Sequence, residues 1–227
     1  MVMKKLSKYK PSAKFANDRT KIIAKHVSNK ITLDIGSIQH KFSLSNSKSW
    51  LFHTIKNNAK CAIGVDIAKK EVLKARSAGY NILWGDAHTI KLNKKFEVIT
   101  ACNIIEHLTN PGIFLDNMYR HLKKDGVLIL TTKNNGGFET FYDSLLLGCI
   151  PNNLEHTCWY DYVTLKELTR RSNFSIKDVI YVLDTKLPRR YKQSRYSKIK
   201  QLFWKQLVQL RSNLAPEIIL ILKKNEK

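Results

Sequence analysis

The chain has few cysteines and no long apolar run. Its four cysteines among 227 residues form no Cys-x-x-Cys pair, which excludes a disulfide framework and a zinc ribbon. This cysteine usage favours a reducing compartment. No apolar run approaches the ~20 residues that a membrane-spanning helix needs, and residues 1–30 contain no apolar stretch typical of a signal peptide. We therefore expect a cytoplasmic protein without a transmembrane segment.

Acidic residues are also scarce, because 18 Asp and Glu stand against 40 Lys and Arg and give a net charge of +22. The excess lies in two flanks. Residues 1–30 hold nine basic side chains and one acidic side chain, and residues 185–216 hold nine basic and none acidic. Residues 31–184 carry only +4. Such flanks favour an anionic partner, which could be nucleic acid, an anionic membrane surface or a phosphorylated substrate. A Lys-rich composition with a solvated surface is the alternative interpretation.

Hydrophobic residues make up 43% of the chain, which excludes a disordered or fibrous protein and suits one domain of ordinary size. Short apolar runs alternate with amphipathic segments. The predicted strands are 31–35, 61–65, 81–84, 96–101, 127–131, 174–183 and 217–222. The predicted helices are 50–58, 68–78, one that begins at Pro111, and 164–172. This alternation indicates an α/β fold with a mainly parallel sheet that helices cover on both faces.

Polar residues and glycines follow several of these strands. In a doubly wound sheet, ligands bind beyond the carboxyl ends of the strands, so the residues at those ends are the informative ones. They are Asp34-Ile-Gly36, Asp66, Gly85-Asp86-Ala87 and Asn103. Taken singly, an Asp after a strand is often only a helix cap.

Five segments, in order along the chain, resemble the motifs of class I S-adenosylmethionine-dependent methyltransferases. They are Leu33-Asp-Ile-Gly36, Gly64-Val-Asp-Ile67, Gly85-Asp-Ala87, Phe96 to Leu108 with its Glu-His-Leu ending, and Leu122 to Asn134. The likeness is greatest to the methyltransferase type 11 branch that includes ubiquinone-biosynthesis O-methyltransferases, with a looser echo in 156–159 and 164–168. The resemblance implies a Rossmann-like, doubly wound sheet of seven strands, mostly parallel with an antiparallel last strand. It also implies S-adenosyl-L-methionine as the cofactor.

The resemblance assigns roles to the residues at the strand ends. Gly36 lets the backbone approach the amino-acid part of the cofactor, where a Cβ would clash. Asp34 would accept a hydrogen bond from the ammonium group of the cofactor, directly or through water. Asp66, followed by Ile67, would accept hydrogen bonds from both ribose hydroxyls.

The other two motifs complete the expected cofactor site. Asp86 would accept a hydrogen bond from the adenine amino group, with the N–H of Ala87 facing a ring nitrogen, and Asn103 would line the methionine portion. The chain departs from the family at Ser37, where a further glycine is usual. We expect Ser37 to substitute a hydroxyl or backbone contact, and residues 41–49 to be an insertion.

Two histidines are the candidate catalytic residues. His107 follows the fourth strand near the methyl-transfer position that the resemblance implies, and His156 lies in the stretch that would cap the acceptor. A neutral histidine can take a proton from a hydroxyl group. The alternatives are a hydrogen-bonded core histidine for His107 and a loop contact for His156. No metal is expected, because Asn103 replaces an acidic metal ligand of the ubiquinone-type enzymes.

The expected organisation is a basic N-terminal segment over 1–30 and one methyltransferase domain over 31–227. The domain would carry an acceptor-side cap over 134–162 and a basic helical insertion over 185–216. If the strand 174–183 is parallel to the others, it ends at the catalytic rim. Four basic side chains of the insertion would then lie near the acceptor mouth: Arg189, Arg190, Lys192 and Arg195.

Three functions remain open at this point. The first is methyl transfer to a small-molecule, lipid-linked or glycan acceptor, with oxygen as the expected methylated atom and peripheral association with a membrane surface. The second is methylation of a nucleic acid recruited by the basic flanks. It is disfavoured because Asn103-Ile-Ile-Glu106 is not an Asn/Asp-Pro-Pro-aromatic motif. The third is a non-catalytic cofactor-binding or scaffold protein.

Overall fold

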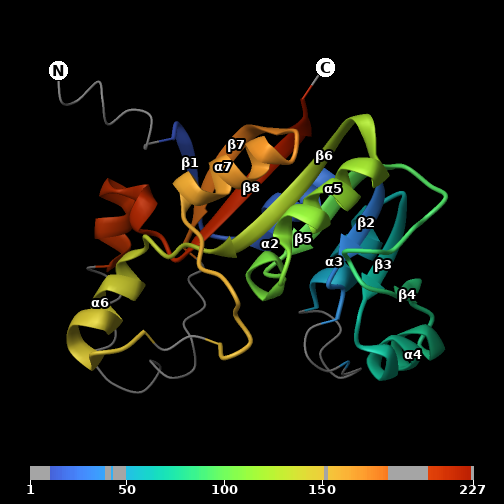
Figure 1. Cartoon of the computed structure of the whole chain (residues 1–227), viewed down its shortest axis with the longest axis horizontal. Helices are drawn as coiled ribbons and strands as arrows, with labels where there is room; N and C mark the ends of the chain where they lie inside the picture. The colour runs from blue at the N-terminus through green and yellow to red at the C-terminus, as the bar shows by residue number, and fades with distance from the viewer. Residues whose placement is uncertain (1–10, 39–41, 43–49, 151–152, 184–203, 226–227) are drawn as a thin grey trace.

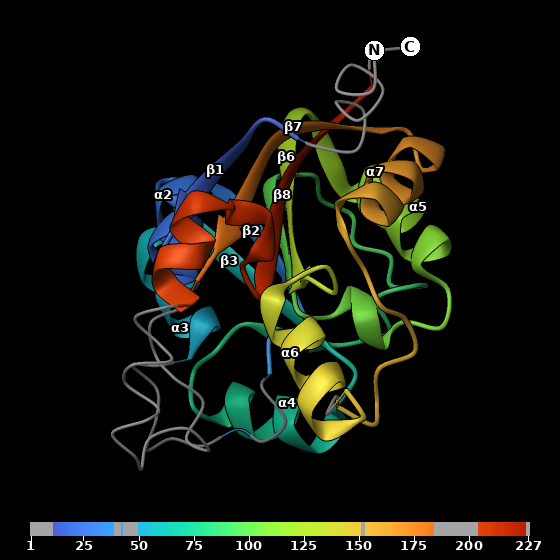
Figure 2. The same cartoon turned by 90° about the vertical axis from the view of Figure 1, so that its left-hand side faces the viewer.

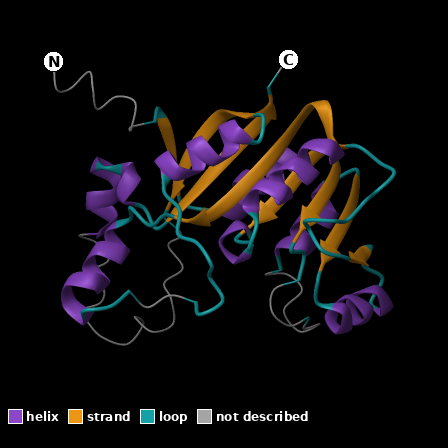
Figure 3. Cartoon of the chain, in the orientation of Figure 1, coloured by secondary structure: helices purple, strands orange, loops and turns teal. Residues whose placement is uncertain are grey.

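The computed structural model describes residues 11–38, 42, 50–150, 153–183 and 204–225, which form a sheet with helices around it (Figures 1 and 3). The strands described are β1 (Ala13–Ala16), β2 (Ile31–Ile35), β3 (Cys61–Asp66), β4 (Ile82–Trp84), β5 (Phe96–Cys102), β6 (Leu122–Lys133), β7 (Phe174–Val182) and β8 (Glu217–Lys224). The helices described are α2 (Arg19–Val27), α3 (Leu51–Asn58), α4 (Lys69–Ser77), α5 (Pro111–His121), α6 (Phe138–Leu147) and α7 (Tyr162–Arg171). Two short 3-10 helices are η3 (Ile105–His107) and η5 (Ser212–Leu214).

The strand order is β1-β7-β8-β6-β5-β2-β3-β4. All neighbouring pairs are parallel except β6 with β8 and β7 with β8, so β8 alone is antiparallel. The Rossmann-like α/β sheet, its antiparallel last strand and the parallel course of β7 are therefore confirmed. The carboxyl ends of β2 to β7 meet at one edge, where ligands bind in such sheets.

The described sheet has eight strands where the sequence predicted seven. The additional strand is β1, which lies within the predicted basic N-terminal segment and pairs in parallel with the edge of β7, with Ala13 opposite Val179. Its Lys14 forms an ion pair with Asp178 on β7. A strand of four residues with one basic side chain has too little apolar pattern to predict, and it is typical of a protected sheet edge.

The helices pack on both faces of the sheet, as predicted (Figure 2). Ile23 and Val27 of α2 share one core cluster with Val98 and Ile129. On the other face, three side chains of α5 and one of α7 pack against the alternate positions of the same strands: Phe114, Leu115, Met118 and Leu165. The strands thus bury both sides of the pleat, which explains their continuous apolar runs.

Helix starts follow capping chemistry. Asn110 caps α5 by accepting a hydrogen bond from the N–H of Ile113, with Pro111 as the first helical residue, as predicted. In α7 the cap is Asp161, which forms a reciprocal capping box with Thr164. The predicted start at residue 164 was therefore too late, because Thr164 is the third residue of the helix and not its cap.

The chain between β7 and β8 lies partly outside the described residues. The predicted rim cations Arg189, Arg190, Lys192 and Arg195 all lie in that undescribed stretch. Residues 204–210, which lie within the predicted insertion over 185–216, form a helix. Among the described helices, none is long and apolar enough to cross a membrane.

Candidate functional site

A first cavity of about 950 Å³ opens beyond the carboxyl ends of β2, β3 and β5. All the residues predicted to bind the cofactor line it: Asp34, Gly36, Ser37, Asp66, Ile67, Asp86, Ala87 and Asn103. The candidate catalytic residues His107 and His156 line it as well. The fold therefore brings every predicted site residue to one cavity.

The turn after β2 approaches the cavity closely through Gly36. This glycine has a φ of +71°, which favours glycine, and its N–H donates to the carbonyl of Val65 over 2.9 Å. A Cβ at this position would lie 3.1 Å from the side chain of Ile104. The positive φ and this close neighbour both disfavour a side chain at position 36, so bare backbone lines the cavity there.

Ser37 has its hydroxyl turned into the turn rather than toward the cavity. The hydroxyl donates to the carbonyl of Asp34 over 2.8 Å, and the residue is buried. A Cβ on Gly64 would lie 2.4 Å from that hydroxyl oxygen, so the glycine of β3 makes room for the serine. Since its proton is used within the turn, Ser37 has only oxygen lone pairs left for a ligand.

Asp34 is buried beneath this turn. The hydroxyl of Thr100 donates to its Oδ1 over 2.6 Å. Burial raises the pKa of Asp34 to about 7; the Thr100 hydrogen bond opposes this shift, and the nearby charge of Asp66 adds to it. At neutral pH this carboxyl group is therefore only partly ionised, and a cationic ligand would favour its charged form.

Asp66 connects the turns after β2 and β3. Its Oδ2 accepts from the N–H of Ile38 over 2.8 Å, and its Oδ1 accepts from the N–H of Ala68 over 2.9 Å. Both oxygens are thus fixed in place, and each keeps a further lone pair for a ligand hydroxyl.

Asp86 lines the first cavity just after β4. Its Oδ1 accepts from the N–H of His88 over 2.8 Å, and the ring Nδ1 of His88 lies 2.7 Å away. The backbone hydrogen bond lowers the pKa of Asp86, so the group stays ionised at neutral pH. The carbonyl of the next residue, Ala87, is held in place, because the side-chain amide of Asn117 donates a hydrogen bond to it over 3.0 Å.

A second cavity of about 400 Å³ lies beside the first, between the end of β6 and α6. The two cavities share five lining residues: Arg19, Asn103, Glu106, Lys133 and His156. Asn103 has a φ of +52°, unusual for a residue other than glycine, and its side-chain oxygen accepts from the Thr131 hydroxyl over 3.1 Å. Backbone in this sparsely populated region is common where a residue is held for a function.

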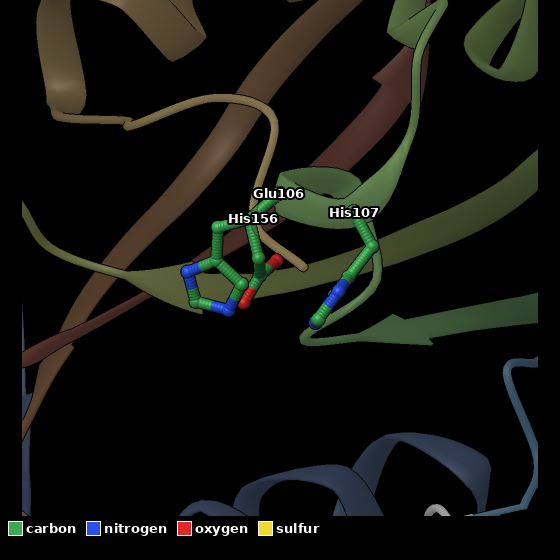
Figure 4. A group of neighbouring side chains, drawn as sticks. All are labelled: Glu106, His107 and His156. Carbon is green, nitrogen blue, oxygen red and sulfur yellow. The ribbon is translucent and has the colours of Figure 1, made fainter. Parts of the chain in front are cut away.

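Glu106, His107 and His156 gather at the junction of the two cavities (Figure 4). One ligand atom from each lies within 4.8 Å of the other two. The two imidazole rings are 4.6 Å apart and nearly perpendicular. Burial raises the pKa of Glu106, whereas burial and then the charge of His107 lower the pKa of His156.

The segment that carries His156 is held against η3. The N–H of Thr157 donates to the carbonyl of Glu106 over 2.8 Å, and its hydroxyl donates to the carbonyl of Leu108 over 2.8 Å. These bonds fix His156 beside the Glu-His pair, although fifty residues of chain separate them.

Sequence reasoning missed several residues of the site. Glu106 was visible in the Glu-His pair, but no role was assigned to it, and Arg19 gave no signal because it belongs to the N-terminal flank. Among the described residues, three buried polar atoms that line the second cavity have no hydrogen-bond partner: Glu106 Oε2, Thr132 Oγ1 and Tyr160 OH. Such atoms are costly unless a ligand or water satisfies them.

Solved structures of similar fold come from several methyltransferases. The methyltransferase that binds the Trm112 activator in Haloferax volcanii superposes with a TM-score of 0.61 at 11% identity, covering 91% of this chain and 88% of that one. Magnesium protoporphyrin IX methyltransferase from Synechocystis PCC 6803, solved with bound SAH, gives 0.57 at 11% identity, covering 90% and 81%. At these identities the likeness shows the fold.

Sequence relatives cover a shorter stretch. The ubiquinone biosynthesis O-methyltransferase of Rickettsia prowazekii is 24% identical over 104 residues, which is 44% of this chain and 41% of the relative. The corresponding enzyme of Rickettsia canadensis is 31% identical over 61 residues, or 27% of this chain and 26% of the relative. The matched part thus spans less than half the length of each relative.

Residues 10–179 match the family described as "Methyltransferase domain", and this match covers most of the chain. The fold is that of S-adenosylmethionine-dependent methyltransferases, and the chain belongs to the methyltransferase domain family.

Proposed function

We propose that the chain transfers the sulfonium methyl group of S-adenosylmethionine to a hydroxyl oxygen of a small-molecule, lipid-linked or glycan acceptor. The first cavity would hold the cofactor and the second the acceptor. The supporting observation is that the two cavities meet at Asn103, Glu106 and His156, so the reacting atoms of two ligands can come together there.

The chemistry needs a group that takes one proton. The acceptor oxygen forms a bond to the methyl carbon while the carbon–sulfur bond breaks, and the electron pair of that bond stays on sulfur as S-adenosylhomocysteine. His156 would take the hydroxyl proton, because its lowered pKa keeps the imidazole neutral at pH 7. The Glu106 carboxyl group beside it would stabilise the imidazolium that forms.

The same three side chains fit a divalent metal ion. The sequence predicted no metal because Asn103 is not acidic, yet the structure provides a carboxylate and two imidazoles from Glu106, His107 and His156. A metal bound there would polarise the acceptor hydroxyl. In that case His156 would hold the metal instead of the proton.

We also propose that the protein is cytoplasmic and associates peripherally with an anionic membrane surface through residues 185–216. The absence of acidic residues from this segment supports the proposal. Recruitment of nucleic acid by the same charge is the alternative, and a salt series with RNA, DNA and anionic vesicles distinguishes the two.

The test of the proposed function combines binding with product analysis. Calorimetry is expected to show binding of S-adenosylmethionine. Radiolabelled methyl groups are expected to enter the lipid or small-molecule fraction of a cell extract. Absence of binding at millimolar cofactor would refute an enzyme, and label in the nucleic-acid fraction would refute the proposed acceptor class.

Cofactor affinity is expected to rise with pH between about 6 and 8. S-adenosylmethionine carries a net positive charge, which favours the ionised form of Asp34. Because the pKa of Asp34 is about 7 in the free protein, binding below pH 7 must first release a proton. We expect up to roughly a tenfold weaker affinity at pH 6 than at pH 8, measured by calorimetry.

The control for this pH effect is Asp34→Asn, which keeps an oxygen for the Thr100 hydroxyl but has no proton to lose. Its affinity should change little with pH over the same range. A slope as steep as that of the wild-type protein would show that another group is responsible.

A further inference from the structure

Helix α6 has its amphipathic character reversed. Its only buried side chain is that of Asp143, an acid. Four large apolar side chains of the same helix remain 57–68% exposed: Phe141, Leu145, Leu146 and Leu147. A helix on a water-exposed surface normally buries its apolar stripe and exposes its charges.

The polar side of α6 faces the second cavity. Glu139, Thr140 and Asp143 all line that cavity, and Asp143 shares a side of the helix with the other two because it lies four residues after Glu139 and three after Thr140. Phe141 and Leu145, four residues apart, lie on the opposite side. The helix therefore gives its hydrogen-bonding groups to the proposed acceptor and its apolar groups to the outside.

The loop that carries His156 also exposes apolar side chains. Leu154 is fully exposed and Trp159 is 48% exposed, while Trp159 also lines the second cavity. An exposed tryptophan thus lies at the second cavity itself. Tryptophan is enriched where a protein meets the boundary between lipid and water.

The base of α6 is firmly attached although the helix stands outside the layered body (Figures 1 and 2). The buried side-chain amide of Asn134 donates to the carbonyls of Asn213 and Ala215, each over 2.8 Å. A Cβ on Gly137, which precedes the helix, would lie 2.9 Å from the Ala215 carbonyl oxygen. These contacts fix the direction in which the apolar face points.

We propose that the outward face of α6, formed by Phe141 and Leu145, docks on an anionic lipid bilayer together with the exposed Leu146 and Leu147 at the end of the helix, and delivers a lipid-embedded acceptor to the second cavity. The delivery rests on the proposed function, whereas the docking does not. Membrane contact would then involve α6 as well as the basic insertion.

The size of the face favours a bilayer over a protein partner. A helix of ten residues is about 15 Å long and about 10 Å wide, which covers far less than the ~800 Å² that each partner of a stable protein interface buries. Shallow insertion of a few apolar side chains is enough for an interfacial helix, provided that charge attraction adds to it.

The charge of the chain supplies that attraction. β6, which leads into α6, and β7 are parallel, because both are antiparallel to β8. Both therefore end at the same edge of the sheet. The chain that leaves β7 carries nine basic and no acidic side chains over residues 185–216. An apolar face and a basic segment that begin at one edge are the two elements of binding to anionic membranes.

The test is co-sedimentation of the full chain, without cofactor, with vesicles of phosphatidylcholine alone or mixed with phosphatidylglycerol. We expect binding to the anionic vesicles that weakens with salt. The double variant Phe141→Ser/Leu145→Ser should bind at least tenfold more weakly. The control Leu73→Ser/Ile113→Ser, which changes exposed apolar residues on α4 and α5, should bind like the wild-type chain.

Melting temperature and cofactor binding of both variants check that they fold. Unchanged vesicle binding of the α6 variant, or no binding by the wild-type chain, would overturn the proposal. So would a dimer in analytical ultracentrifugation that the α6 variant abolishes, because a second copy would then cover the face. Vesicle binding without methyl transfer would refute only the proposed function, since the docking assay contains no cofactor.

Discussion

Replacing His156 with asparagine is expected to lower the turnover number by roughly 10²- to 10⁴-fold, the range typical of a lost general base. Affinity for S-adenosylmethionine should change much less, because the residues expected to hold the cofactor's charged and polar groups belong to β2, β3 and the turn after β4. Single-turnover measurements of methyl transfer, combined with calorimetry, separate the two quantities. Equal losses in turnover and affinity would mean that His156 binds the cofactor rather than moving a proton.

The control for this variant is His26→Asn, which makes the same substitution on α2. The Nδ1 atom of His26 lies 2.8 Å from the carbonyl oxygen of Ile22 in that helix. It should leave methyl transfer unchanged.

The role of His156 is tested further by the pH profile. If His156 is the base, the rate falls only below its unperturbed pKa of about 6.5, because burial lowers the pKa. Chelation with EDTA should leave that rate intact, and a loss restored by a divalent ion would assign His156 to a metal instead.

The sheet and the cofactor cavity could be predicted because their signals are local. The central strands are mostly apolar, since both of their faces are buried, and β2, β3, β4 and β5 end at or just before a glycine, an aspartate or an asparagine. Residues at the carboxyl ends of parallel strands meet at one edge of the sheet, so the positions of these ends in the sequence predict which residues line a cavity there. This explains why the three predicted aspartates all line the first cavity: Asp34, Asp66 and Asp86.

Features that depend on distant parts of the chain could not be predicted. β1 is recognisable only through its pairing with β7, and four residues cannot carry a periodic pattern. Helix α6 escaped prediction as an element, because its apolar residues face outward and its buried residue is acidic. A prediction that places apolar residues in the core would turn the wrong side of such a helix toward the protein.

The chemistry at the junction was also out of reach of the sequence. Glu106 and His156 come together through the hydrogen bonds of Thr157 to η3, which no spacing rule describes. Ser37 shows a related difficulty. A serine in a ligand-binding turn suggests a hydroxyl for the ligand, but the direction of that hydroxyl depends on the space that Gly64 leaves on the next strand.

Asp66→Ala is expected to weaken binding of S-adenosylmethionine by roughly 10²- to 10⁴-fold, since two hydrogen bonds to a charged group contribute about 1.5–3 kcal/mol each. The carboxylate has two functions in the structure. It holds the N–H groups of Ile38 and Ala68, and its remaining lone pairs face the first cavity, where the resemblance places the ribose hydroxyls. Calorimetry of the variant and the wild-type chain measures the loss.

The two functions can be separated with a ligand that lacks the ribose hydroxyls. If Asp66 binds them directly, the 2′,3′-dideoxy analogue of S-adenosylhomocysteine should bind the variant and the wild-type chain with similar affinity. If Asp66 only shapes the turns, the variant should lose affinity for both ligands equally, which would remove the ribose contact from the site. Asp125→Ala, which changes an exposed aspartate near the start of β6, is the matched control and should leave both affinities unchanged. A variant Asp66→Ala that binds the cofactor as tightly as the wild-type chain would refute the assignment of the first cavity to the cofactor.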